Sequence, residues 1–117
     1  MSESKLRSQS MDFAVQIINL VKALKEKRES IISNQIGRSG TSIGANIREA
    51  QYAHGKADFV AKLHIALKEC SETEYWIELL IESGYYHDKT ILDRCVEVKR
   101  ILISSITTAK ENIDVKK

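Results

Sequence analysis

Apolar residues recur at three- and four-residue steps along most of the chain, which is the spacing of a helix with one buried face. Four segments carry this spacing, and they predict helices over about 10–27, 31–53, 56–83 and 88–113. The sequence has no proline and only 5 glycines, so nothing in its composition interrupts long helices. The pattern therefore predicts an all-α fold.

Residue types typical of helix ends separate these segments. Ser10 and Asp88 are suited to be N-caps of the first and fourth helices. His54-Gly55 and Gly84 are suited to end the second and third helices, because glycine readily adopts the left-handed conformation found there. Connections this short force successive helices to reverse direction, which predicts an antiparallel up-down-up-down four-helix bundle.

A chain of 117 residues is long enough for a single core. We expect one bundle domain over residues 10–113. Residues 1–9 are polar and are predicted to be a disordered N-terminal tail, and residues 114–117 a frayed C-terminus.

The third predicted helix is apolar on more than one side. A stripe that includes Leu63, Ala66 and Cys70 would serve a bundle core, and one stripe is enough for that purpose. The surplus apolar residues predict burial against another subunit. The predicted oligomer interface consists of Phe59, Val60, Trp76 and Leu79.

The second predicted helix contains three glycines, Gly37, Gly40 and Gly44, on one side. Each costs about 1 kcal/mol relative to alanine in a helix interior, so close approach of a neighbouring helix must offset that cost. We therefore expect a tight helix crossing. The alternative is that residues 39–44 form a loop between two short helices.

The same segment has a polar face at helical spacing, for which Glu69 and Glu72 on the next helix are natural partners. One interpretation is a polar layer within the bundle that fixes its register. The other is a phosphate-binding surface that uses Arg38, Arg48 and Lys56. The complete predicted network is Gln35, Arg38, Ser42, Asn46, Glu49, Glu69 and Glu72.

The formal net charge is only +2, so no global basic field points to nucleic acid. Residues 1–56 nevertheless carry 9 basic and 5 acidic side chains, whereas residues 57–87 carry 2 and 6. Opposite signs on successive helices indicate helix-to-helix complementarity, and the alternative is a basic binding surface. The candidate nucleic-acid contacts are Lys22, Lys25, Lys27, Arg28, Arg48 and Lys56.

The sequence contains no HExxH or GxxxxGK[ST] motif, no histidine follows a glutamate by three residues, and no histidine is placed to serve as a base for the serines of residues 39–44. We therefore expect no enzymatic activity, metal or cofactor; the alternative is a metal-binding or enzymatic bundle that uses Glu69 and Glu72. Cys70 and Cys95 predict reduced core thiols, with a structural disulfide as the alternative. Because no signal sequence or apolar run of membrane-spanning length is present, the sequence predicts a cytoplasmic location and no membrane association.

Two strings, SGTSIGANIREAQ and KADFVAKLHIALKECSETEYWIELL, resemble the small four helix bundle protein family, also called the large-subunit ribosomal RNA intervening-sequence proteins. The resemblance covers about residues 12–108. It departs at Ala50 and Gln51, where the family usually has a glycine and then a basic residue. The matching motif residues are Gln35, Arg38, Ser42, Ile43, Asn46, Ile47, Glu49, Asp58, Phe59, Leu63, Ile65, Ala66, Glu69, Glu72 and Glu74.

This resemblance implies an up-down four-helix bundle that assembles as a homopentamer with a central pore. A related branch, the accessory protein of diversity-generating retroelements, is a basic pentamer that binds nucleic acid and a reverse transcriptase. By analogy we expect a non-enzymatic oligomeric bundle that acts as a nucleic-acid-associated adaptor. Its candidate partners are further copies of itself, RNA or DNA, and a nucleic-acid enzyme.

Overall fold

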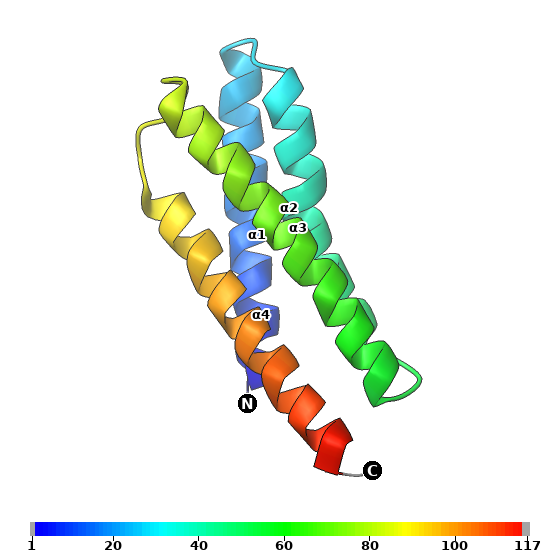
Figure 1. The fold of residues 1–117 in the computed structure, drawn as a ribbon. Helices are drawn as coiled ribbons and strands as arrows, with labels where there is room; N and C mark the ends of the chain where they lie inside the picture. The colour runs from blue at the N-terminus through cyan, green and yellow to red at the C-terminus, as the bar shows by residue number, and fades with distance from the viewer. Residues whose placement is uncertain (1, 116–117) are drawn as a thin grey trace.

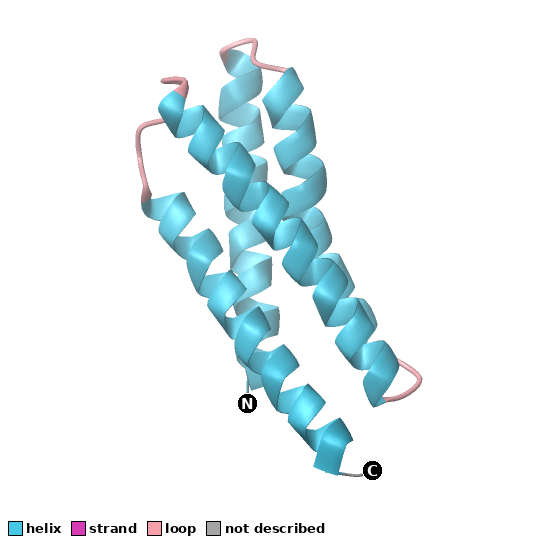
Figure 2. Ribbon diagram, in the orientation of Figure 1, coloured by secondary structure: helices cyan, strands magenta, loops and turns pink. Residues whose placement is uncertain are grey.

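A computed structural model of the protein describes residues 2–115, and it confirms the all-α prediction. The four helices are α1 Ser2–Glu26, α2 Ile31–Gln51, α3 Lys56–Glu82 and α4 Thr90–Val115. No strand occurs among the described residues (Figure 2). The four helices pack lengthwise into a body of 53 by 21 by 20 Å.

Helices that follow each other in the sequence pack side by side, and α4 also packs against α1. The α1–α2 and α3–α4 connections lie at one end of the molecule (Figure 1). The α2–α3 connection and both ends of the chain lie at the other end. At the first end, Lys27 Nζ donates a hydrogen bond of 3.0 Å to the carbonyl oxygen of Tyr85, which ties the two connections together.

Helix α1 begins at Ser2, so the predicted start at Ser10 and the predicted tail are wrong for residues 2–9. Leu6 lies seven residues before Phe13, continues its stripe and is buried in the core. Burial of this leucine contributes roughly 2 kcal/mol, which helps to hold the first turns of the helix. Ser10 lies inside the helix, where its hydroxyl donates to the Arg7 carbonyl oxygen at 3.1 Å.

Helix α4 ends at Val115, two residues beyond the predicted end. Residues 116 and 117, where the predicted frayed terminus ends, lie outside the described residues. Asp88 caps the start of this helix as predicted, because its Oδ1 accepts from the Thr90 main-chain N–H at 2.9 Å.

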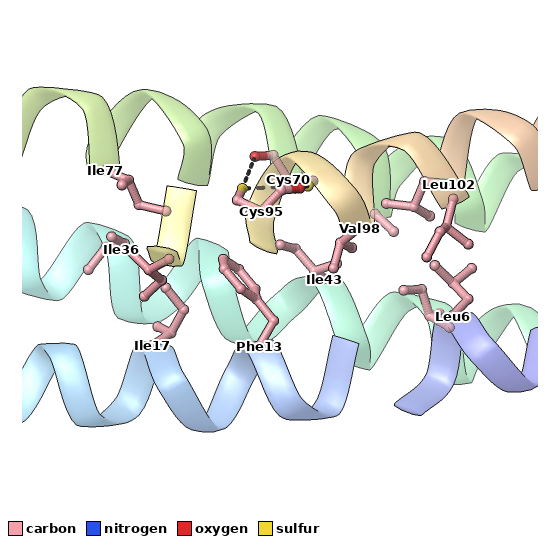
Figure 3. Packing of buried hydrophobic residues seen from close by; sticks show 14 of the residues in the cluster. Leu6, Phe13, Ile17, Ile36, Ile43, Cys70, Ile77, Cys95, Val98 and Leu102 are labelled. Atoms are coloured by element: carbon pink, nitrogen blue, oxygen red, sulfur yellow. Dashed lines mark hydrogen bonds between the residues drawn. The ribbon is translucent and has the colours of Figure 1, made fainter. Parts of the chain in front are cut away.

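The core is formed by the facing apolar stripes of all four helices (Figure 3). Close packing of branched side chains excludes water along the bundle axis, and this burial is the main stabilising contribution to the fold. The core residues labelled in Figure 3 are Leu6, Phe13, Ile17, Ile36, Ile43, Cys70, Ile77, Cys95, Val98 and Leu102.

Helices α1 and α3 end in the same way, with a left-handed residue just beyond the last turn. Arg28 has φ 63° and Gly84 has φ 84°. At both ends, the residue after the left-handed one donates its main-chain N–H to the carbonyl oxygen of the residue five positions before it. In α1 this bond joins Glu29 N to Leu24 O at 2.9 Å. The predicted termination of α3 at Gly84 is confirmed. Gly55 is not left-handed, however, because its φ of 161° is extended backbone, so its predicted function as a terminator is wrong.

Helix α2 is continuous through residues 39–44, so the alternative of a loop there is wrong. The predicted tight crossing is confirmed, and the neighbouring helix is α1. A Cβ added to Gly40 would lie 2.8 Å from Ile17 Cγ1, and one added to Gly44 would lie 3.5 Å from Ser10 Oγ. The absence of a side chain at Gly40 is what lets the two helices approach.

Candidate functional surfaces

A charged cluster lies along the seam between α2 and α3. Arg38 and Ser42 are one helical turn apart on α2, and Glu69 and Glu72 are one turn apart on α3. Arg38 Nη1 lies 3.1 Å from Glu69 Oε2, and its second amino group contacts Glu72 Oε2. Ser42 Oγ donates to the same Glu69 oxygen at 3.0 Å. The structure therefore brings together four of the seven residues in the predicted network.

The cluster lies at the surface of the bundle, so the predicted position of this polar layer within the core is wrong. The side chain of Arg38 is 52% exposed, compared with 17% for Glu69 and 33% for Glu72. The reason is side-chain length: the guanidinium reaches the carboxylates from the rim of the helix interface, where it stays hydrated. An exposed ion pair of this kind contributes little to stability.

The other three predicted members do not join this cluster through their side chains. Asn46 Nδ2 donates to the carbonyl oxygen of Ser42 within its own helix at 2.9 Å. Glu49 lies 3.7 Å from Lys62 Nζ on α3. Gln35 is exposed. Asn46 thus makes an intrahelical hydrogen bond instead of the interhelical contact expected of a register-fixing residue.

The buried polar contact between α2 and α3 is instead made by Ser39 and Thr73, which were not predicted. Thr73 Oγ1 lies 2.8 Å from Ser39 Oγ, and both residues are fully buried. The same threonine hydroxyl bonds the carbonyl oxygen of Glu69 at 2.8 Å. A signal was present in the sequence, because each residue occupies an apolar stripe position: Ser39 between Ile36 and Ile43, and Thr73 three residues after Cys70.

Charges on successive helices are complementary, as the sequence indicated. The ion pairs of Arg38, Lys62 and Lys99 each join two different helices. Besides the pairs of Arg38, α3 is linked to α2 through Lys62 and to α4 through Glu74, whose Oε1 lies 2.6 Å from Lys99 Nζ. Three acidic residues of α3, Glu69, Glu72 and Glu74, thus pair with basic residues on its two neighbours.

Contacts to Glu72 favour its charged form. Trp76 Nε1–H donates to Glu72 Oε2 at 2.9 Å, and this bond together with Arg38 lowers the pKa of the carboxyl group. The hydrogen bond and charge of Glu72 raise the pKa of Arg38. Neither group is therefore suited to exchange a proton near neutral pH.

The contacts of Arg38 with Glu69 and Glu72 are also evidence on the alternative that these two glutamates bind a metal ion. One guanidinium occupies the space between the carboxylates of Glu69 and Glu72, which a bound cation would need. No group of three His, Cys, Asp or Glu side chains within the described residues could hold a metal ion. The geometry of this face favours an ion pair.

Acidification should be visible in the fluorescence of Trp76, the only tryptophan of the chain. Because the pKa of Glu72 is lowered, its stabilising contacts are complete above the ordinary glutamate pKa and are lost as pH falls through the lower folded-state value. We expect the emission to change with a midpoint below the usual pKa of about 4.3. Glu72→Gln should abolish this step, and Glu78→Gln should leave it in place. A midpoint at or above the usual value would contradict the assignment.

The six candidate nucleic-acid contacts do not form one surface. Lys22 and Arg28 lie near the C-terminal end of α1, as do Lys25 and Lys27, and all four are exposed. Arg48 lies near the opposite end of the bundle, close to the α2–α3 connection, and Lys56 begins α3 beyond it (Figure 1). Because α2 has 21 residues and spans roughly 30 Å, a single phosphate group cannot contact both sets.

The apolar residues predicted to be surplus on α3 are mostly covered by the chain itself. Val60 is buried in the core, so its prediction as an interface residue is wrong. Phe59 and Trp76 are partly buried and pack against the same core. Leu79 is also partly buried. The sequence pattern could not separate these positions, because α3 contacts two helices and buries a wider arc than one stripe.

The exposed apolar surface instead includes a stripe on α1. Met11, Val15 and Ile18 follow one face at steps of four and three residues, and they are 52%, 51% and 46% exposed. A groove of about 390 Å³ lies between α1 and α2 beside Met11. The residues lining it are Arg7, Ser10, Met11, Ala14, Thr41, Gly44, Ala45, Arg48 and Glu49.

None of the helices within residues 2–115 has the length and hydrophobicity that crossing a membrane would require.

Known proteins resemble this chain in both sequence and fold. The family model described as 23S rRNA-intervening sequence protein matches residues 2–104. No curated protein matches the chain. A similar solved structure is a protein with unknown function from the S23 ribosomal protein family of Bacteroides thetaiotaomicron. It is 50% identical, with a TM-score of 0.89 over 92% of this chain and 99% of that chain. The chain therefore belongs to the 23S rRNA-intervening sequence protein family.

Proposed function

We propose that this protein is a non-enzymatic subunit of a homopentamer of up-down-up-down bundles, and that the assembly acts as an adaptor bound to nucleic acid. The alternation of the three connections between the two ends of the molecule supports the up-down topology (Figure 1). Membership of the 23S rRNA-intervening sequence protein family supports a setting close to ribosomal RNA genes. The proposal combines one surface for assembly with another for binding.

The apolar stripe of α1 is the observation that carries the proposal. Met11, Val15 and Ile18 are each about half exposed on one face of a helix whose opposite face is buried. A contiguous apolar surface of this kind is unfavourable in water and marks a protein contact. In a ring of five the contact must be heterologous, so a different face of the neighbouring subunit has to receive the stripe.

A second apolar region on α3 is suited to receive it. This region lies around Tyr75, which is 58% exposed. Tyr75 makes an edge-on contact with Trp76, with ring centroids 5.1 Å apart, and Leu79 follows one turn later. Two predicted interface residues, Trp76 and Leu79, therefore remain in the proposed interface as the partly buried border of this region.

Nucleic acid would be bound at the end of the bundle where α1 finishes. Lys22, Lys25, Lys27 and Arg28 are exposed there. A ring that points these ends in one direction would repeat the four cations around one rim, and phosphate affinity rises with the number of cationic contacts. Assembly would thus give a chain with a net charge of only +2 a locally basic surface.

The test is binding of structured RNA to the purified protein at several salt concentrations. We expect retention at low salt that weakens steeply as salt is raised. Reversing two charges in Lys22→Glu/Arg28→Glu should abolish it, whereas the matched pair Arg48→Glu/Lys110→Glu at the other end should retain it. Absence of salt-dependent retention would refute the nucleic-acid part, and duplex DNA measured alongside would show whether binding is specific to RNA.

A further inference from the structure

The two cysteines of the chain face each other inside the core. Cys70 Sγ on α3 and Cys95 Sγ on α4 are 3.8 Å apart, and both residues are completely buried (Figure 3). Each sulfur also lies close to the main-chain carbonyl oxygen of the other cysteine, at 3.5 and 3.6 Å. These reciprocal contacts require the two main chains to approach closely at this point.

The pair joins the C-terminal helix, α4, to the rest of the bundle. Helix α4 packs against α3 and α1 but has no close packing with α2 among the described residues. Since α4 is also the last helix of the four, opening it away from α3 would leave the contacts among α1, α2 and α3 in place. A covalent link between Cys70 and Cys95 would prevent that opening.

We propose that Cys70 and Cys95 are a disulfide-forming pair that is oxidised by a small-molecule disulfide and reduced by a small thiol. The disulfide would link α4 covalently and reversibly to α3. The proposal does not depend on the proposed function. A disulfide needs its sulfurs about 2.0 Å apart, so the two sulfurs have to move together by less than ~2 Å in total. Rotation of the two side chains within the core can supply a movement of this size.

The chemistry is two successive thiol–disulfide exchanges. One cysteine thiolate attacks a sulfur of the small disulfide, forms a mixed disulfide with it and releases one small thiolate. The second cysteine thiolate attacks the protein sulfur of that mixed disulfide and releases the second small thiolate. The two protons lost by the cysteines go to the released thiolates, so two protein thiols are oxidised as one small disulfide is reduced to two thiols.

Reaction has to follow opening of α4, for two reasons. The small disulfide cannot reach either buried sulfur in the closed bundle. In addition, the contact with Cys70 and burial raise the pKa of the Cys95 thiol, so little thiolate forms there while the core is closed. Oxidation of the pair therefore begins only after α4 has opened. Closure of the helix then brings the second sulfur into contact with the mixed disulfide.

The test compares folded and urea-unfolded protein equilibrated in glutathione buffers of graded oxidised-to-reduced ratio. Free thiols and intact mass are measured after acid quenching. Because the fold holds the sulfurs together, we expect the folded protein to become half oxidised in buffer at least about tenfold more reducing than the unfolded chain needs. The product should be a single chain, not linked to another chain by a disulfide, that has lost two hydrogens and carries no glutathione.

By linkage, the oxidised protein should also melt at a higher temperature than the reduced protein, and reductant should restore the original value. Cys70→Ser and Cys95→Ser should each remove both the mass change and the rise in melting temperature. The proposal is overturned if folded protein needs the same or a more oxidising buffer than unfolded protein. It is equally overturned if the main product of the folded protein is an interchain disulfide or a stable glutathione adduct.

Discussion

Val15→Asp should convert the assembled protein into a folded monomer. Val15 is the central residue of the α1 stripe and is 51% exposed in the single chain, so aspartate should not disturb the core. In an assembly the same position would bury an unpaired carboxylate, which costs about 3 kcal/mol or more and weakens each contact ~100-fold. Light scattering after size-exclusion chromatography measures the mass, and circular dichroism checks that the helices remain.

Ile103→Asp is the matched control. Ile103 is 47% exposed on α4, so the substitution has the same chemistry and nearly the same exposure, but it lies outside both proposed contact regions. It should leave the assembly intact. If Val15→Asp has the parent mass, or if both variants dissociate, the α1 stripe is not the specific interface.

Gly40→Ala should destabilise the fold, although alanine is a better helix former than glycine. The added methyl carbon would lie 2.8 and 2.9 Å from the two γ carbons of Ile17. Ile17 is completely buried, and its β-branched side chain has one strongly preferred χ1 rotamer in a helix. Moving it away from the added methyl group would therefore cost free energy. Overpacking lowers the free energy of unfolding by about 1–3 kcal/mol and the better helix propensity of alanine raises it by about 1 kcal/mol, so we expect a net loss of up to about 2 kcal/mol in urea unfolding.

Gly44→Ala is the control for this crossing and should have the opposite sign. Its new methyl carbon would lie 3.5 Å from Ser10 Oγ, an ordinary contact, so only the helix-propensity gain of up to about 1 kcal/mol remains. If both variants stabilise the protein equally, α1 and α2 do not cross as closely at Gly40 as described.

The sequence predicted the helices and the glycine crossing because both depend on local patterns. Helical spacing of apolar residues identified all four helices, and three glycines on one side of α2 indicated a close neighbour. The start of α1 could not be predicted in the same way. Leu6 is an isolated leucine in a polar segment, and its burial depends on its position at a small cavity that Ile47 of α2, Leu63 of α3 and Ser105 of α4 also line.

The candidate surfaces were less predictable, because they depend on how the arcs of neighbouring helices cover each other. Arg38 and its two glutamates could be paired from their spacing, but their position at the rim and not in the core follows from the packing of α2 on α3. Val60 lies in the part of α3 that the rest of the chain covers, whereas Val15 lies in a part of α1 that it leaves open. Periodicity alone does not distinguish these two valines.

The mass of the unmodified protein in solution shows whether the chain assembles as a pentamer. Multi-angle light scattering, repeated over a range of protein concentrations, is sufficient. We expect a mass five times that of the 13.3 kDa chain. A monomeric mass at every concentration would contradict this expectation, because the exposed apolar stripe of Met11, Val15 and Ile18 would then have no subunit to cover it.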